Sequence, residues 1–262
     1  MKAMDKKVSK YFPDPAIDDL SSHAHRQLIG MIGLVLPHLL WLIAGWRLMK
    51  GLQRWELLSS ISAYYYTGAV AVFSGALVAL AVFLFSYRGY DNQQRRRDRI
   101  AANIAGAAAI LVAFFPTDVP KGFPALSWWT PIMGTIHYVS AVILFSSFIF
   151  FSLFLFPISK LEKEELPPDK LARNRIYISC GVAIVLCIIW AFIAVYNDAP
   201  IFWPEALALE FFAISWLVKG RVDKTAAAAG KQTLQYVRDP RQMVDDVKKS
   251  IRGTDWTPEQ QR

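Results

Sequence analysis

The sequence predicts an all-α membrane protein, a polytopic bundle of six transmembrane helices with both termini in the cytoplasm. Of its 262 residues, 54% are hydrophobic and 19% are charged. Soluble domains average roughly 45–50% apolar residues and about 25% charged residues. Apolar runs long enough to cross a bilayer, which takes about 20 helical residues, recur along the chain. None alternates polar and apolar residues as a membrane β-strand does. A soluble globular enzyme is therefore largely excluded.

Six apolar windows define the expected spans, and each closes its own backbone hydrogen bonds, as hydrocarbon requires. In chain order they cover residues 28–46, 67–87, 100–116, 131–156, 177–196 and 204–218. The fourth and sixth open with a proline, Pro131 and Pro204, as helices often do. The expected organisation is an N-terminal cytoplasmic segment (1–27), a six-helix domain (28–219) and a cytoplasmic tail (220–262).

Lys and Arg residues set the expected orientation, because cytoplasmic loops retain cations. Of the 29 in the chain, 25 lie in the two terminal segments, Lys219 included, and in the loops 88–99 and 159–176. The other four are Arg47, Lys50, Arg54 and Lys121. We therefore expect a multi-pass protein of a bacterial inner membrane with both termini in the cytoplasm. The net charge of +8 reflects this bias, so no nucleic-acid partner is expected.

The tail contains a further predicted helix, over about residues 240–252. Asp239 and Pro240 form a helix start, with a capping Asp and a Pro at the first helical position, and Asp14 and Pro15 form another. The apolar residues of the tail helix share one face: Met243, Val244, Val247 and Ile251. Such a helix lies on the inner membrane surface or docks on a membrane-protein partner.

Small residues at four-residue spacing mark where helices are expected to approach closely. Gly75 with Ala79 forms one pair, and Ala102 with Gly106 forms another in the alanine-rich third span. Such pairs favour close helix packing in membranes.

Seven side chains expected near the outer ends of the spans form the candidate site. They are Tyr64, Tyr65, Tyr66, Asp118, His137, Glu205 and Glu210. Polar groups at membrane depth are costly, so they call for an explanation. His137 and Glu210 each lie six residues after the proline that opens their span, which places both ~9 Å below the outer helix ends. If these helices face one another, the two form a buried acid–base or hydrogen-bonded pair.

Three roles stay open for His137 and Glu210: a structural link between helices, a ligand or lipid head-group site, and catalysis. In an enzyme, His137 would be the general base and Glu210 its orienting partner. The three tyrosines fit an interfacial aromatic belt as well as a binding cage. One His with three carboxylates underdetermines a zinc site, so we expect no metal and no cofactor.

The other histidines are given simpler interpretations. His38 lies beside Pro37 in the middle of the first span, where packing around a kink explains it. His23 and His25 precede the first span in a polar segment and are expected to be solvated.

Four strings carry a family resemblance: Ser60–Tyr66, Phe83–Asp91, Phe114–Thr117 and Ile136–Tyr138. Together they resemble uncharacterised bacterial six-span proteins akin to the domain of unknown function 998 group, and more distantly the Frag/DRAM/Sfk type. The resemblance covers about Ser59 to Phe156. It implies that Pro116 and His137 are motif positions, and it suggests lipid handling, which is associated with eukaryotic members. It implies no catalytic assignment, and Glu210 lies outside it.

Three functions are compatible with these patterns. The first is an outward-facing polar pocket that binds or processes a membrane lipid or amphiphile, lined by the candidate residues. The second is a structural or accessory subunit of a larger membrane complex, with the tail as a contact surface. The third is a small-solute or ion pathway, which would need polar residues through the inner half as well, where only Asn103 is found.

Overall fold

The computed structural model describes residues 15–46, 55, 57–87, 95–158 and 168–221. The chain divides after Gly220 into two units, and the fold described below belongs to the first. The predicted tail helix over residues 240–252 lies outside the described residues.

Every regular element in the described part of the chain is helical, which confirms the all-α prediction. The elements are α2 (Pro15–Trp46), the 3₁₀ helix η1 (Ser62–Tyr66), α3 (Val70–Ser86), α4 (Arg95–Phe114), α5 (Pro131–Phe150), its π-helical continuation η2 (Phe151–Leu155), α6 (Pro168–Tyr196) and α7 (Phe202–Lys219). Each of the six α-helices overlaps one predicted apolar window.

Three of the described helical stretches are long and apolar enough to cross a membrane. They are His23–Trp46, Pro131–Leu155 and Pro168–Tyr196, and Val70–Ser86 is a shorter apolar helix. α4 begins with a run of charged residues from Arg95 to Arg99, while α7 carries Glu205, Glu210 and Lys219 within its length. The three long apolar helices support a membrane protein. α4 and α7 differ from them in carrying charged residues.

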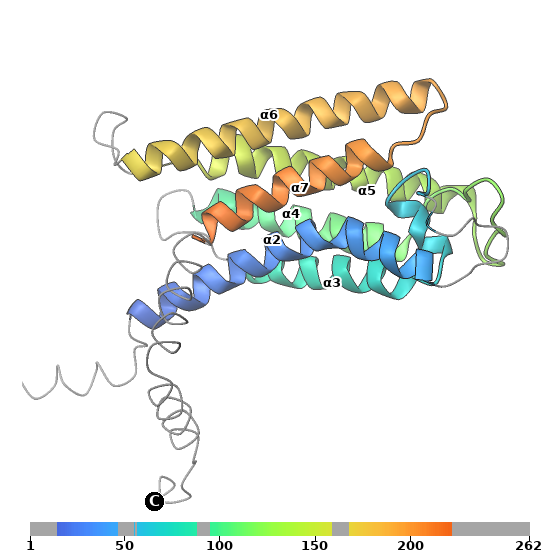
Figure 1. The fold of residues 1–262 in the computed structure, drawn as a ribbon. Coiled ribbons are helices and arrows are strands. Elements are labelled where there is room, and N and C mark those ends of the chain that lie inside the picture. The colour runs from blue at the N-terminus through green and yellow to red at the C-terminus, as the bar shows by residue number, and fades with distance from the viewer. Residues whose placement is uncertain (1–14, 47–54, 56, 88–94, 159–167, 222–262) are drawn as a thin grey trace, which may run out of the picture. The chain divides into compact units, whose positions relative to one another are not determined.

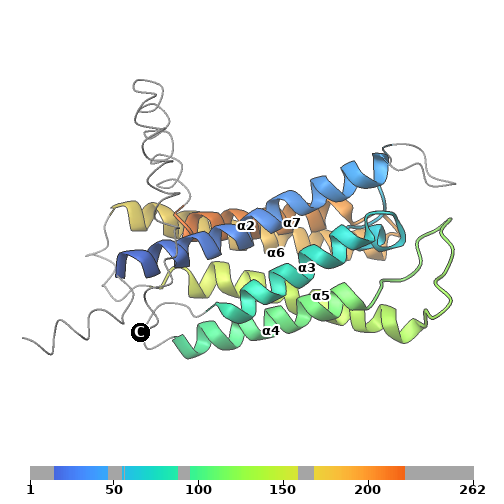
Figure 2. The ribbon, with the colours of Figure 1, turned by 90° about the horizontal axis from the view of Figure 1, so that it is seen from below.

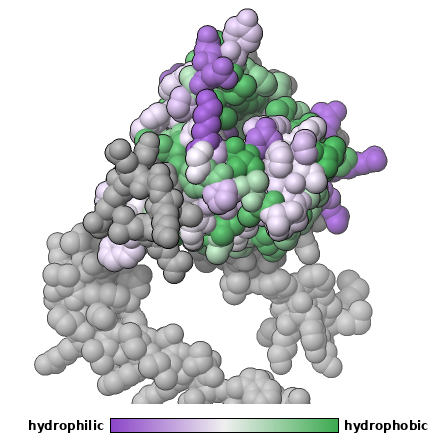
Figure 3. Space-filling model, turned by 90° about the vertical axis from the view of Figure 1, so that its right-hand side faces the viewer, coloured by the Kyte–Doolittle hydropathy of each residue, from purple (hydrophilic) through white to green (hydrophobic). Residues whose placement is uncertain are grey.

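The six helices pack in a closed ring in which every helix contacts the next along the chain, and α7 returns to contact α2. Figures 1 and 2 show them running side by side along one common direction. η1 lies with the loops 115–130 and 197–201 at one end of this bundle, called here the η1 end (Figure 1). Figure 3 looks onto this end, where hydrophilic and hydrophobic side chains are interspersed.

Glycines set the closest approaches between helices. A Cβ atom on Gly30 would lie 2.7 Å from Cγ of Leu217 and 2.9 Å from the carbonyl oxygen of Ala213, so the α2 backbone packs directly against both a side chain and the backbone of α7. A Cβ on Gly106 would lie equally close to the ring of Phe85, which confirms a tight contact between α3 and α4. Around Gly75 nothing lies within 4 Å, so the close approach predicted there is wrong.

α2 begins at Pro15, well before the first apolar window, and this changes the interpretation of His25. Its Nε2 lies 2.7 Å from the carbonyl oxygen of Phe83 on α3, and its ring packs edge-on against the Phe83 ring. The expectation that His25 is solvated is wrong. A search for apolar runs identifies the apolar part of α2. It misses the N-terminal part of this helix, where a polar side chain packs against α3.

Candidate functional site

His137 links three elements at the η1 end. It extends from α5, and its side chain is buried, with 1% of the residue exposed. Its Nδ1 lies 2.7 Å from the carbonyl oxygen of Phe115, just after α4, and its Nε2 lies 2.8 Å from Oγ of Ser62 in η1. Because a carbonyl only accepts, Nδ1 carries the proton and the neutral ring accepts from the Ser62 hydroxyl at Nε2. Both ring nitrogens are therefore used in holding η1 to α4 and α5.

Glu205, on α7, binds the segment of chain that precedes η1. Its Oε2 accepts the backbone N–H of Ile61 at 2.7 Å. Nearby, the backbone N–H of Ile201 donates to the carbonyl oxygen of Ser59 at 2.6 Å. The chain ahead of η1 is thus bound to the beginning of α7 by two hydrogen bonds.

The three tyrosines of η1 pack within the bundle. Tyr64 is fully buried, and its ring lies 6.0 Å from that of Phe202. Tyr66 donates its hydroxyl to the carbonyl oxygen of Thr117 at 2.7 Å. Burial, reinforced by the negative charge of the nearby Asp118, raises the pKa of Tyr66 to about 12, so the phenol stays protonated and keeps this bond.

The predicted pair of His137 and Glu210 is wrong. Both ring nitrogens of His137 have other partners, and the carboxylate of Glu210 faces His38 on α2. α7 packs against α2 and α6 and makes few contacts with α5. The two residues were placed at similar depth, but depth along the bundle does not decide which helices are neighbours in the ring.

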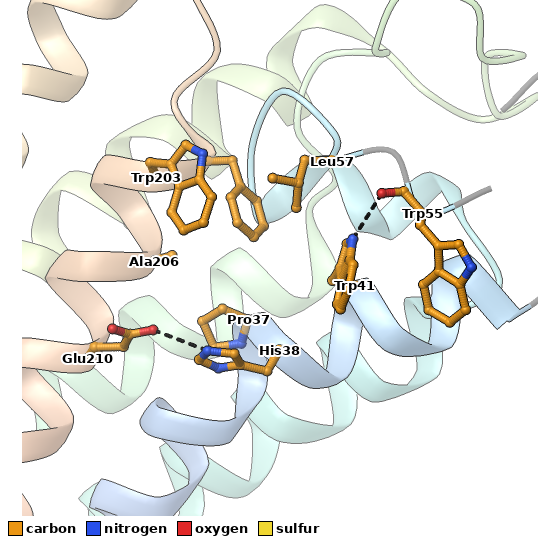
Figure 4. A pocket seen from close by; sticks show the side chains of 9 residues that line it. Pro37, His38, Trp41, Trp55, Leu57, Trp203, Ala206 and Glu210 are labelled. Atoms are coloured by element: carbon orange, nitrogen blue, oxygen red, sulfur yellow. Dashed lines mark hydrogen bonds and ion pairs between the residues drawn. The ribbon is translucent and has the colours of Figure 1, made fainter. Parts of the chain in front are cut away.

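Glu210 lies instead in a pocket between α2 and α7, shown in Figure 4 and called here the α2–α7 pocket. Its volume is about 340 Å³, within the range of small-molecule sites. The lining residues are Pro37, His38, Trp41, Trp55, Leu57, Phe202, Trp203, Ala206 and Glu210. Apart from His38 and Glu210, the walls are apolar or aromatic.

The two ionisable groups sit together at one side of this pocket. Nε2 of His38 lies 3.6 Å from Oε1 of Glu210, and 69% of the His38 side chain is exposed against 26% of Glu210. His38 is eight residues before the end of α2 and Glu210 eight residues after the start of α7, so both lie ~12 Å from the η1 end. Because most of the His38 side chain is exposed, the pocket opens on the outside of the bundle. Its two ionisable groups lie well inside the bundle ends along the helix direction.

Tryptophans form the side of the pocket nearer the η1 end. Nε1 of Trp41 donates to the carbonyl oxygen of Trp55 at 3.1 Å, and the two rings lie 5.3 Å apart. Trp55 has a left-handed backbone, with φ of 69°. Its ring covers Gly45 so closely that a Cβ atom there would overlap it. The absence of a side chain at Gly45 is what admits the Trp55 ring.

A second, internal cavity of about 50 Å³ lies among the helices. Its walls are apolar, with Ser62 and Glu205 as its polar side chains. Ser62 is committed to His137 and Glu205 to Ile61, so the polar groups of this cavity belong to the links around η1.

The structure does not bring the seven predicted site residues into one pocket. Glu210 lines the α2–α7 pocket, and Glu205 lines the internal cavity. Asp118 is exposed in the loop after α4, with its carboxylate against Gly134. Their roles in binding or catalysis stay predictions, and no cluster of three or more potential metal ligands occurs within the described ranges.

His38 is the residue that sequence reasoning interpreted too simply. A histidine in the middle of an apolar span is a signal in itself, because polar groups at membrane depth are costly. The neighbouring Pro37 offered a sufficient explanation, and nothing in the sequence linked His38 to Glu210, which follows it by 172 positions. Only the closing contact between the first and last helices reveals the pair.

Comparison with protein-family models, with curated proteins and with solved structures gives no match to this chain. The resemblance to the domain of unknown function 998 group stays a prediction.

Proposed function

We propose that the protein is a six-span bacterial inner-membrane protein that binds a lipid or amphiphile in the α2–α7 pocket, with both termini in the cytoplasm. The observation that carries the proposal is the pocket itself: an aromatic recess that opens on the outside of the bundle and contains a carboxylate and an imidazole. An opening on the flank of a membrane bundle faces acyl chains, so its natural ligand is a molecule already dissolved in the bilayer.

Three features support six spans. The six helices close one ring, and α4 and α7, of 20 and 18 residues, are about 30 and 27 Å long, close to the thickness of the hydrocarbon core. The charges of α4 are confined to its first turns, where they can lie in the head-group region. The two carboxylates of α7 have partners on other elements, Ile61 and His38.

The orientation is tested by cysteine labelling of intact cells. In a background of Cys180→Ala and Cys187→Ala, we expect a cysteine at Lys121 to react with a membrane-impermeant maleimide. A cysteine at Arg97 should react only after the cells are opened. Labelling of the Arg97 position in intact cells would reverse the proposed topology.

Ligand binding is tested by tryptophan quenching in detergent micelles with an octyl alcohol that carries a terminal bromine. Site binding gives quenching that saturates at a low mole fraction of probe, whereas lipid-like contact rises in proportion to it. Trp41→Phe should reduce the saturating part, of which Trp55 and Trp203, which also line the pocket, supply the rest. The matched control is Trp190→Phe, because Trp190 is exposed on α6 away from the pocket and should contribute only to the proportional part. Quenching without a saturating component would refute the proposed function.

A further inference from the structure

The polar groups of the α2–α7 pocket are arranged as hydrogen-bond acceptors. Nδ1 of His38 lies 3.1 Å from the carbonyl oxygen of Leu34, and since a carbonyl cannot donate, Nδ1 carries the hydrogen. In the neutral ring, Nε2 then presents a lone pair, and it faces the carboxylate oxygen of Glu210. When the ring is neutral, two hydrogen-bond acceptors therefore lie next to each other at this side of the pocket.

The distance between these two atoms indicates that no strong bond closes the gap. Nε2 and Oε1 are 3.6 Å apart, whereas hydrogen bonds between a protonated nitrogen and a carboxylate are about 2.7–2.9 Å long. The gap leaves room for a third group that donates both to Nε2 of the neutral ring and to the carboxylate.

The walls of the pocket favour a positive charge at this place. Trp41 and Trp203 border the space above His38 and Glu210 (Figure 4), and the faces of tryptophan rings attract cations. The indole N–H of Trp41 is already donated to Trp55. Among the described residues that line the pocket, the ionisable side chains are His38 and Glu210, and none is a Lys or Arg.

We propose that the ligand of the α2–α7 pocket carries a protonated primary amine, which donates to Nε2 of His38 and to the carboxylate of Glu210 against the tryptophan faces. This proposal rests on the proposed function and names the head group of the amphiphile. A primary ammonium group has three donors, no acceptor and a positive charge, so it matches each feature of the site. A phosphate or carboxylate head would be repelled by Glu210, and a carbonyl head group would find acceptors where it needs donors.

The test compares three probes that share a bromine-terminated octyl chain and end in a primary amine, a trimethylammonium group or an alcohol. In the wild-type protein, we expect the amine to saturate the quenching at a concentration about tenfold lower than the alcohol. The trimethylammonium probe should bind between the two, because it has the charge but no N–H donor. Using the same micelles for all three probes cancels the effect of the detergent.

Glu210→Gln should abolish the preference for the amine over the alcohol, because the amide keeps the size of the side chain and loses the charge. Glu205→Gln is the matched control. It removes a carboxylate from the same helix, and its amide oxygen can still accept the N–H of Ile61, so the preference should remain about tenfold.

Each other outcome refutes a defined part of the reasoning. Equal binding of amine and alcohol by the wild-type protein would overturn the ammonium assignment and leave amphiphile binding intact. Equal binding of amine and trimethylammonium would overturn donation to His38 and Glu210. A preference that survives Glu210→Gln would place the amine elsewhere. If none of the three probes gives saturating quenching, the proposed function itself fails. The comparison of probes on the wild-type protein does not depend on whether any variant folds.

Discussion

Replacing His137 with phenylalanine should destabilise the protein through two lost hydrogen bonds. Phenylalanine fills much of the same space, but it leaves the Ser62 hydroxyl and the Phe115 carbonyl without their partner in a buried site. A net hydrogen bond contributes about 1 kcal/mol, and a buried polar group left unpaired costs about 1–3 kcal/mol. Hydrogen bonds between membrane helices average lower, about 0.6 kcal/mol. We therefore expect a loss of about 2–3 kcal/mol.

The loss is measured as the midpoint of thermal unfolding in detergent. For a chain of this size, about 2–4 °C corresponds to each kcal/mol, so His137→Phe should lower the midpoint by about 4–12 °C. A double-mutant cycle then tests the mechanism. Ser62→Ala alone should cost about 1 kcal/mol, but it should cost much less in the His137→Phe background, because its partner is already gone.

Two results would refute this account. A His137→Phe variant that unfolds within about 1 °C of the wild type would show that the linked ring contributes little to stability. Additive losses in the double mutant would show that His137 and Ser62 act independently, against the 2.8 Å contact between them.

Three further predictions follow from the packing. Gly30→Ala should lower the unfolding midpoint by about 2–10 °C because its Cβ meets the α7 backbone, whereas Gly75→Ala, in open space, should leave it unchanged or raise it slightly. The pKa of Tyr66 is raised from 10.0 to about 12 in the folded state, so the protonated phenol contributes to the free energy of unfolding in full below pH 10. This contribution is lost as the pH rises towards 12. Tyr66→Phe should remove this part of the pH dependence of stability. Gly45→Ala should displace the ring of Trp55 and shift the tryptophan emission of the wild type, and an unchanged spectrum would contradict the packing described for that ring.

The helices were predictable because each is a local property of the chain. A run of apolar residues identifies a helix that buries its backbone in hydrocarbon or protein, whatever its neighbours are. The start of α5 at Pro131 follows in the same way from proline at a first helical position. The helix start predicted from Asp14 and Pro15 is confirmed at Pro15, although the apolar window begins only at residue 28, because the residues before it include polar groups such as His25 that pack against α3.

The site was predicted only in part. The polar character of the η1 end was anticipated, and His137 and Glu205 do lie there as buried links. The tyrosines proved to be packing residues of η1, as Tyr64 shows by its complete burial. The sequence predicts only a packing role for His38 beside Pro37, whereas in the structure His38 is the partner of Glu210.

Residue spacing along a helix determines how far a side chain lies from the helix end, at about 1.5 Å per residue, so the sequence alone predicts this distance. It says nothing of the direction in which the side chain points around the ring or of the helix it meets. The direction of each side chain and the helix it meets were decided by packing. Gly30 allows α7 to pack closely against α2, and this contact places Glu210 next to His38, while His137 bonds to Ser62. The amino-acid order therefore specified six helices, three of them long and apolar enough to cross a membrane, and the positions of polar groups along them. The neighbour relations that create a pocket arose only when the first and last helices met.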